Sequence, residues 1–67
     1  MMTTLVNGET RVFEEGMTLL GALHALGVEA PGIAVAVNDD VVPRSRFGEH
    51  QLREGDAVEI IRAVAGG

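Results

Sequence analysis

The residues best placed to do chemistry are the glycines that close the sequence Val64-Ala65-Gly66-Gly67. Residues without a Cβ let a backbone pass through a narrow channel. Gly66 would therefore allow the end of the chain to enter such a channel, where Gly67 presents its carboxylate to another protein's active site. An α-carboxyl group has a pKa of about 3.3–3.7 and is ionised at neutral pH. It can therefore attack the α-phosphate of ATP held by a separate enzyme. A frayed terminus without function is the alternative interpretation.

The product of such an attack is an acyl-adenylate on Gly67, from which AMP is a good leaving group. A partner's persulfide or thiolate can displace AMP, and reductive release of a persulfide adduct leaves a terminal thiocarboxylate. Water would hydrolyse the adenylate, so the receiving pockets must be narrow and dry. We expect Gly67 to be the modified residue, with Val64, Ala65 and Gly66 giving access as part of a flexible tail at 63–67 on a single domain, 1–67.

The composition restricts the classes of function. A domain of 67 residues buries only about 60% of its unfolded surface and has little room for an enclosed active site, so we expect a co-substrate rather than an enzyme. The chain has no cysteine, so its own side chains cannot hold sulfur or act as thiolates. We expect no bound cofactor or metal.

The charge and hydropathy pattern bears on partners and location. The net charge is −5, which disfavours nucleic acid and anionic membranes and favours a basic patch on a protein partner. The start of the chain lacks a basic segment followed by a long apolar run, so a cytoplasmic location without membrane contact is expected. All five basic residues are arginine. One explanation is a genome whose codon usage favours arginine. The alternative is a need to avoid internal amines that could attack an activated carboxyl terminus.

Several polar residues do not form a recognisable catalytic or metal site. His24 and His50 lack the cysteines or the compact spacing of a zinc site. Asp39-Asp40 follows Asn38 and is typical of a turn. Ser45 has no histidine in a nucleophile context.

Phe47 and Arg44 form one further candidate, in the irregular segment Arg44-Ser45-Arg46-Phe47. An exposed aromatic ring beside arginine is typical of protein interfaces. Phe47 either contacts a partner together with Arg44 or closes the lower edge of the core.

The first half of the chain predicts a hairpin and one helix. Asn7-Gly8 suits a type I′ turn between two strands within residues 1–13. Thr18 can cap a helix with leucines at 19, 20, 23 and 26 on one face, which Gly27 ends with Val28 packing back. Gly21 is small enough to allow a close approach of this helix to the sheet.

The second half predicts three more strands. The β-branched run Ile33–Val37 indicates a central strand buried on both faces. Residues 41–42 form a short edge strand stopped by Pro43, an irregular segment follows in which Leu52 points inward, and Ala57–Arg62 alternates as the last strand. The order ββαβββ indicates an α+β protein, a β-grasp (ubiquitin-like) roll with a five-stranded mixed sheet, one packed helix and a central last strand.

Three stretches also carry a resemblance to a known family. These are Val35 to Arg44, with its distinctive Asn-x-x-x-Val-Pro-Arg segment, then Gly55-Asp56, and then Val64 to Gly67. Together they resemble the ThiS family, the sulfur carriers of thiamine biosynthesis, over essentially the whole chain. Phe47 stands where a larger aromatic is common in that family, and the doubled Met1-Met2 leaves the start open.

The resemblance implies a set of partners. A ThiF-like adenylyltransferase of the ubiquitin-activating type would use ATP and Mg to activate Gly67, and sulfur would come from a donor such as a cysteine desulfurase. The thiocarboxylate would then dock on a ThiG-like thiazole synthase. Three alternatives stay open: a molybdopterin-synthase-type sulfur carrier subunit, a ubiquitin-like protein modifier that forms bonds to lysine, and a non-covalent β-grasp binding module.

Overall fold

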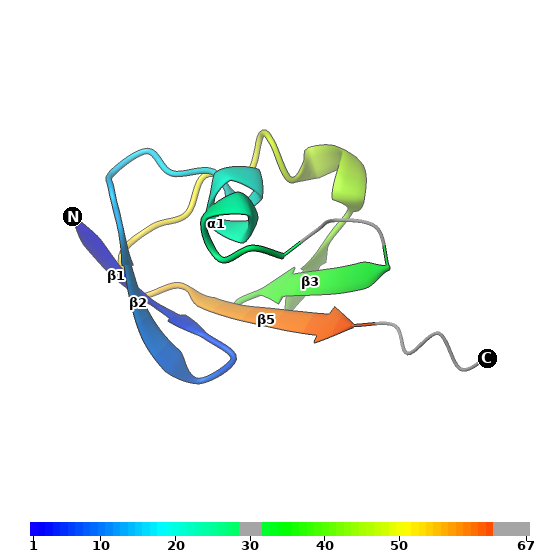
Figure 1. Cartoon of the computed structure of the whole chain (residues 1–67), viewed down its shortest axis with the longest axis horizontal. Helices are drawn as coiled ribbons and strands as arrows, with labels where there is room; N and C mark the ends of the chain where they lie inside the picture. Colours follow the sequence, from blue (N-terminus) through cyan, green and yellow to red (C-terminus); the bar gives the residue numbers. More distant parts are fainter. Residues whose placement is uncertain (29–31, 63–67) are drawn as a thin grey trace.

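Five strands and one α-helix follow one another in the predicted order (Figure 1). The structure is a computed structural model that describes residues 1–28 and 32–62. The elements are β1 (Met2–Val6), β2 (Glu9–Phe13), α1 (Leu19–Ala25), β3 (Ile33–Val37), β4 (Asp40–Val42) and β5 (Ala57–Arg62). A short 3-10 helix, η1 (Arg44–Arg46), lies in the segment predicted to be irregular.

The β1–β2 hairpin forms as predicted. Its two central turn residues, Asn7 and Gly8, have φ values of 50° and 83°, as a type I′ turn requires. The antiparallel register runs from Met2 opposite Phe13 to Val6 opposite Glu9. The turn sequence therefore sets this register.

Helix α1 also begins and ends at the predicted residues. The Thr18 hydroxyl accepts a 3.1 Å hydrogen bond from the amide three residues later, as an N-cap does. Gly27 has a φ of 74°, and the Val28 amide donates back to the Leu23 carbonyl at 2.9 Å. This is the Schellman arrangement, and it returns Val28 to the core as expected.

The prediction that Gly21 allows a close approach of the helix to the sheet is wrong. A Cβ at this position would lie 2.8 Å from Met17 Sδ and 3.3 Å from Thr18 Oγ1. Gly21 therefore gives room to the segment that leads into the helix, and the closest atoms do not belong to the sheet.

The strands form one sheet in the order β2-β1-β5-β3-β4. Strands β1 and β5 are parallel, whereas the other neighbours are antiparallel, so the sheet is mixed and β5 occupies its centre, as predicted. Strand β4 lies at one edge, also as predicted.

Strand β3 differs from its prediction. Val35 and Val37 are buried, but Ala34 is exposed and Ala36 is half-buried, so the strand is not buried on both faces. The physical reason is that α1 and the segment from η1 to Leu52 cover one face of the sheet, while the other face is open (Figure 1).

The core lies between α1 and the covered face of the sheet. Leu19 and Leu23 from the helix are 0% and 1% exposed, and Leu52 is buried as predicted. Phe47 is 2% exposed, so the expectation that its ring contacts a partner is wrong. Phe47 closes the core, because η1 turns its side chain inward while Arg44 stays exposed.

Candidate functional site

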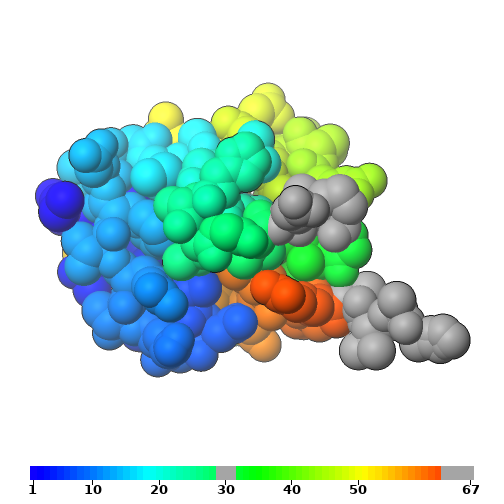
Figure 2. All heavy atoms as spheres, in the orientation of Figure 1, coloured from blue at the N-terminus to red at the C-terminus, as the bar shows by residue number. Residues whose placement is uncertain are grey.

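The exit end of β5, defined here as Ile60, Ile61 and Arg62, is the described segment that leads to the terminal glycines. Figure 2 shows the end of β5 at the surface, between the hairpin and β3. The predicted site residues Val64, Ala65, Gly66 and Gly67 lie outside the described residues. The described part of the candidate site is therefore the strand that precedes them.

Asn38 holds the start of β5. Its amide donates to the Ala57 carbonyl at 2.8 Å, and its side-chain oxygen accepts from the Ala57 amide at 3.0 Å. Its side-chain nitrogen donates to Asp56 Oδ1 at 2.9 Å. Asn38 has a φ of 52° in the β3–β4 turn, where asparagine is well tolerated.

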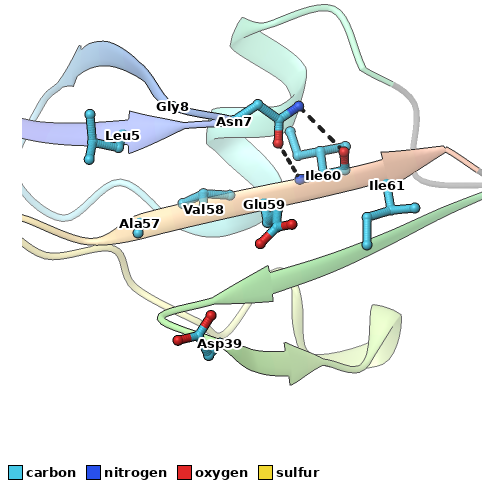
Figure 3. Close-up of a pocket in the computed structure, with 9 residues that line it drawn as sticks. All are labelled: Leu5, Asn7, Gly8, Asp39, Ala57, Val58, Glu59, Ile60 and Ile61. Atoms are coloured by element: carbon cyan, nitrogen blue, oxygen red, sulfur yellow. Dashed lines mark hydrogen bonds between the residues drawn. The ribbon is translucent and has the colours of Figure 1, made fainter.

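Asn7 holds the other end of β5 in the same manner. Its amide donates to the Val58 carbonyl at 2.8 Å. Its Oδ1 accepts from the Ile60 amide at 2.8 Å, and its Nδ2 donates to the Ile60 carbonyl at 3.4 Å (Figure 3). Only the oxygen of the carboxamide can accept from an N–H group, so the shorter bond sets the side chain's orientation. Both hairpin turns thus send an asparagine side chain to the central strand.

The open face of the sheet next to the exit end carries apolar side chains. Leu5 is 44% exposed, Ile61 55% and Val41 76%. In the register of the sheet, Leu5 lies opposite Ala57, and Ile61 lies opposite the exposed Ala34. A face of this kind is suited to contact with another protein.

A shallow hollow of about 510 Å³ lies on this face along β5 (Figure 3). It is lined by Leu5, Asn7, Gly8, Asp39 and residues 57–61. Glu59 and Asp39 bring two exposed carboxylates to it. The combination of apolar surface with negative charge fits a partner surface that is apolar with basic residues around it.

The structure separates the predicted pair Arg44 and Phe47. The Phe47 amide donates to the Arg44 carbonyl at 3.2 Å, so the two residues are one turn apart, but only Arg44 is on the surface. Arg44 follows Pro43 at the end of edge strand β4. It stays a candidate contact residue, without the aromatic neighbour that motivated the pair.

The other polar candidates do not converge on a site. His24 is exposed on α1, His50 is half-buried after η1, and Ser45 is exposed. Within residues 1–28 and 32–62, no group of three or more histidine, cysteine, aspartate or glutamate side chains could hold a metal ion. In that same part of the chain, no helix has the length and apolar character needed to cross a membrane.

Sequence reasoning did not single out Asn7 or the apolar open face. Leu5 lies between the buried residues Thr4 and Val6, and Ile61 follows the half-buried Ile60, so the alternation along the two strands was a usable signal for the open face. For Asn7 the only local signal was the turn itself, since its side-chain bonds reach a residue 53 positions away in the sequence.

The fold matches a known class of structures. The crystal structure of the thiamine biosynthesis protein ThiS from Geobacter metallireducens superposes with a TM-score of 0.85 at 32% identity, covering 98% of this chain and 100% of the other. A five-stranded mixed sheet with one helix and a central last strand is a β-grasp fold, as predicted.

Sequence comparisons identify the family. The model of the ThiS family matches residues 3–67. The sulfur carrier protein ThiS of Thermus thermophilus is 39% identical over 92% of this chain and 95% of its own length. The chain therefore belongs to the ThiS family of sulfur carrier proteins.

One relative is a much larger protein. The thiazole synthase of Paramagnetospirillum magneticum is 36% identical over 66 residues, which make up 98% of this chain. The chain spans about a fifth (20%) of that relative's length.

Proposed function

We propose that this chain carries sulfur as a thiocarboxylate on Gly67 and donates it to thiazole formation in thiamine biosynthesis. The observation that supports this most is the position of β5. It is the central strand of the sheet, it reaches the surface at Arg62, and the sequence continues from there to Gly66-Gly67. A central strand followed by residues without side chains suits delivery of a carboxylate into another protein's pocket.

The proposed reaction proceeds through an acyl-adenylate. A carboxylate oxygen of Gly67 attacks the α-phosphorus of ATP, and pyrophosphate leaves. The terminal sulfur of a partner's persulfide attacks the acyl carbon, and AMP leaves. A thiol then reduces the resulting acyl disulfide, so that the chain keeps the sulfur as a thiocarboxylate and the thiol is oxidised to a disulfide. The chain itself contributes the carboxyl group and no catalytic side chain, and ATP with Mg belongs to the activating partner.

Three partners follow from this chemistry. An adenylyltransferase of the ubiquitin-activating type (ThiF-like) activates Gly67, a persulfide donor such as a cysteine desulfurase supplies sulfur, and thiazole synthase (ThiG-like) accepts it. The match of this chain to a fifth of a thiazole synthase supports the last partner, because carrier and acceptor segments in one chain would meet at high effective concentration. The apolar open face beside the exit end of β5 offers a surface for these contacts, and Arg44 a second one.

Deletion of Gly67 tests the proposal. We expect the truncated chain to keep the thermal melting temperature of the full chain and to lose ATP-pyrophosphate exchange with the adenylyltransferase. Exchange retained without Gly67 would contradict the proposal. In the full chain, intact mass measurement should find one oxygen-to-sulfur replacement on the C-terminal peptide.

The fate of the activated carboxyl group separates the alternatives. Sulfur labelled in cysteine should pass through the carrier into a thiazole, whereas a molybdopterin-type carrier would deliver it to a dithiolene. A protein modifier would instead give conjugates through lysines of other proteins. Absence of both thiocarboxylate and conjugates from sulfur-replete cells would favour the non-covalent binding module.

A further inference from the structure

We propose that Asn7 is a positioning residue for the carrier reaction, because its side-chain carboxamide fixes the exit end of β5 and so the direction in which the chain continues to Gly67. This inference rests on the proposed activation of Gly67. Asn7 acts through Ile60, to which its side chain is hydrogen-bonded.

The carboxamide of Asn7 extends a strand pair that would otherwise stop. The parallel pairing of β1 with β5 comprises Leu5 opposite Ala57 and Val6 opposite Val58. At Asn7 the backbone turns away with a φ of 50°. Its side chain then takes the place of the next strand residue, because it accepts from the Ile60 amide at 2.8 Å and donates to the Ile60 carbonyl at 3.4 Å (Figure 3).

Beyond this point β5 is held from one side. Ile61 and Arg62 lie opposite Ala34 and Ile33 of β3. Within the described residues, the hydrogen bonds given by β1 and its turn end at Ile60. Among the described residues, the Asn7 side chain therefore makes the last hydrogen bonds of the exit end on the β1 side, and without them the backbone of Ile60, Ile61 and Arg62 would pair with β3 alone.

The direction of the exit end matters for the reaction because Gly67 is the fifth residue after Arg62. Such a length of chain spans at most about 18 Å, so the orientation of β5 at Arg62 limits where the carboxylate can be delivered while the open face contacts the enzyme. If the exit end is correctly placed for only a fraction of the time, the apparent affinity equals the intrinsic affinity multiplied by that fraction.

Asparagine suits this role better than the other residues that tolerate the turn. Glycine accepts a positive φ but has no side chain, and aspartate accepts it with an acceptor but no donor. A purely local role in the turn is the competing explanation. Asn38 separates the two, since it has a similar positive φ in a hairpin turn, and its side chain also bonds to β5, but at the start of that strand.

The experiment compares Asn7→Gly with Asn38→Gly in the full chain, using ATP-pyrophosphate exchange with the adenylyltransferase. Both variants keep a residue suited to positive φ and lose the side-chain bonds to β5. Loss of one net hydrogen bond corresponds to a factor of about five in an equilibrium. We expect Asn7→Gly to raise the KM for the carrier about fivefold with kcat unchanged, and Asn38→Gly to leave both constants as in the wild type.

Two further measurements separate positioning from stability. Amide hydrogen exchange at Ile60 should accelerate in Asn7→Gly and stay slow in Asn38→Gly, at matched melting temperatures. Asn7→Asp keeps an acceptor for the Ile60 amide. It should therefore show slow amide exchange at Ile60 and a KM close to that of the wild type.

The outcomes against the inference are distinct from those against the proposed function. Equal KM values for Asn7→Gly and Asn38→Gly, or unchanged exchange at Ile60 in Asn7→Gly, would overturn the positioning role while activation of the wild-type chain stands. No ATP-pyrophosphate exchange with the wild-type chain would overturn the proposed function, and the positioning role with it.

Discussion

Val35 is the residue whose replacement by a charge should be most damaging to the fold. Its side chain is 1% exposed in β3, opposite Ile60 of β5 and Val42 of β4. Val35→Asp loses the burial of an apolar side chain, about 1.5–3 kcal/mol. It also places a carboxylate among apolar neighbours, which costs several kcal/mol more when the group is unpaired.

The sum exceeds what so small a core supplies, about 3–5 kcal/mol. We therefore expect Val35→Asp to be unfolded at neutral pH, without a cooperative transition in urea followed by circular dichroism. Ala34→Asp is the matched control, because Ala34 is the preceding residue of the same strand and is exposed on the open face. It should stay within about 0.5 kcal/mol of the wild type. A cooperative transition for Val35→Asp near the wild-type midpoint would refute the packing of β3.

Four further changes test the helix and the η1 segment. Thr18→Ala removes the acceptor of the Gly21 amide and should lower the free energy of unfolding by about 1 kcal/mol in urea titration; an unchanged midpoint would contradict the cap. Gly27→Ala should cost about 1–2 kcal/mol, because its φ of 74° is unfavourable for a residue with a Cβ, and a more stable variant would count against the Schellman ending. Phe47→Ala should cost about 3–5 kcal/mol, whereas Arg44→Ala should leave the melting temperature unchanged and weaken binding to the partner enzymes. Weak binding without loss of stability in Phe47→Ala would return that ring to the contact surface.

Much of the fold could be predicted because its signals are local. Asn7-Gly8 favours a type I′ turn through the conformations of two residues, and Thr18 and Gly27 bound α1 through hydrogen bonds within one helical turn. The alternation of Val58 and Glu59 likewise indicated which side of β5 is buried. The terminal glycines and the Asn-x-x-x-Val-Pro-Arg segment indicated the family, because both are recognisable as short runs of the linear sequence.

The candidate site could be predicted only in part. Gly67 and its access residues were predicted from the sequence and stay a prediction, since they lie outside the described residues. Arg44 was correctly expected at the surface, but Phe47 was not assigned, because a single aromatic in an irregular segment carries no periodicity that indicates its direction. The 3-10 helix η1 sets the direction of the Phe47 side chain and places it in the core.

The sequence by itself determined the order of the elements, their turns and caps, the lack of cysteine, and the glycines at positions 66 and 67. Tertiary structure alone decided that β3 is covered on one face, and that both turn asparagines reach across to β5. The physical reason is the distance along the sequence over which each interaction acts. Propensities, turns and caps act between residues a few positions apart, whereas the contacts of Asn7 with Ile60 join residues 53 positions apart and exist only once β5 has inserted between β1 and β3.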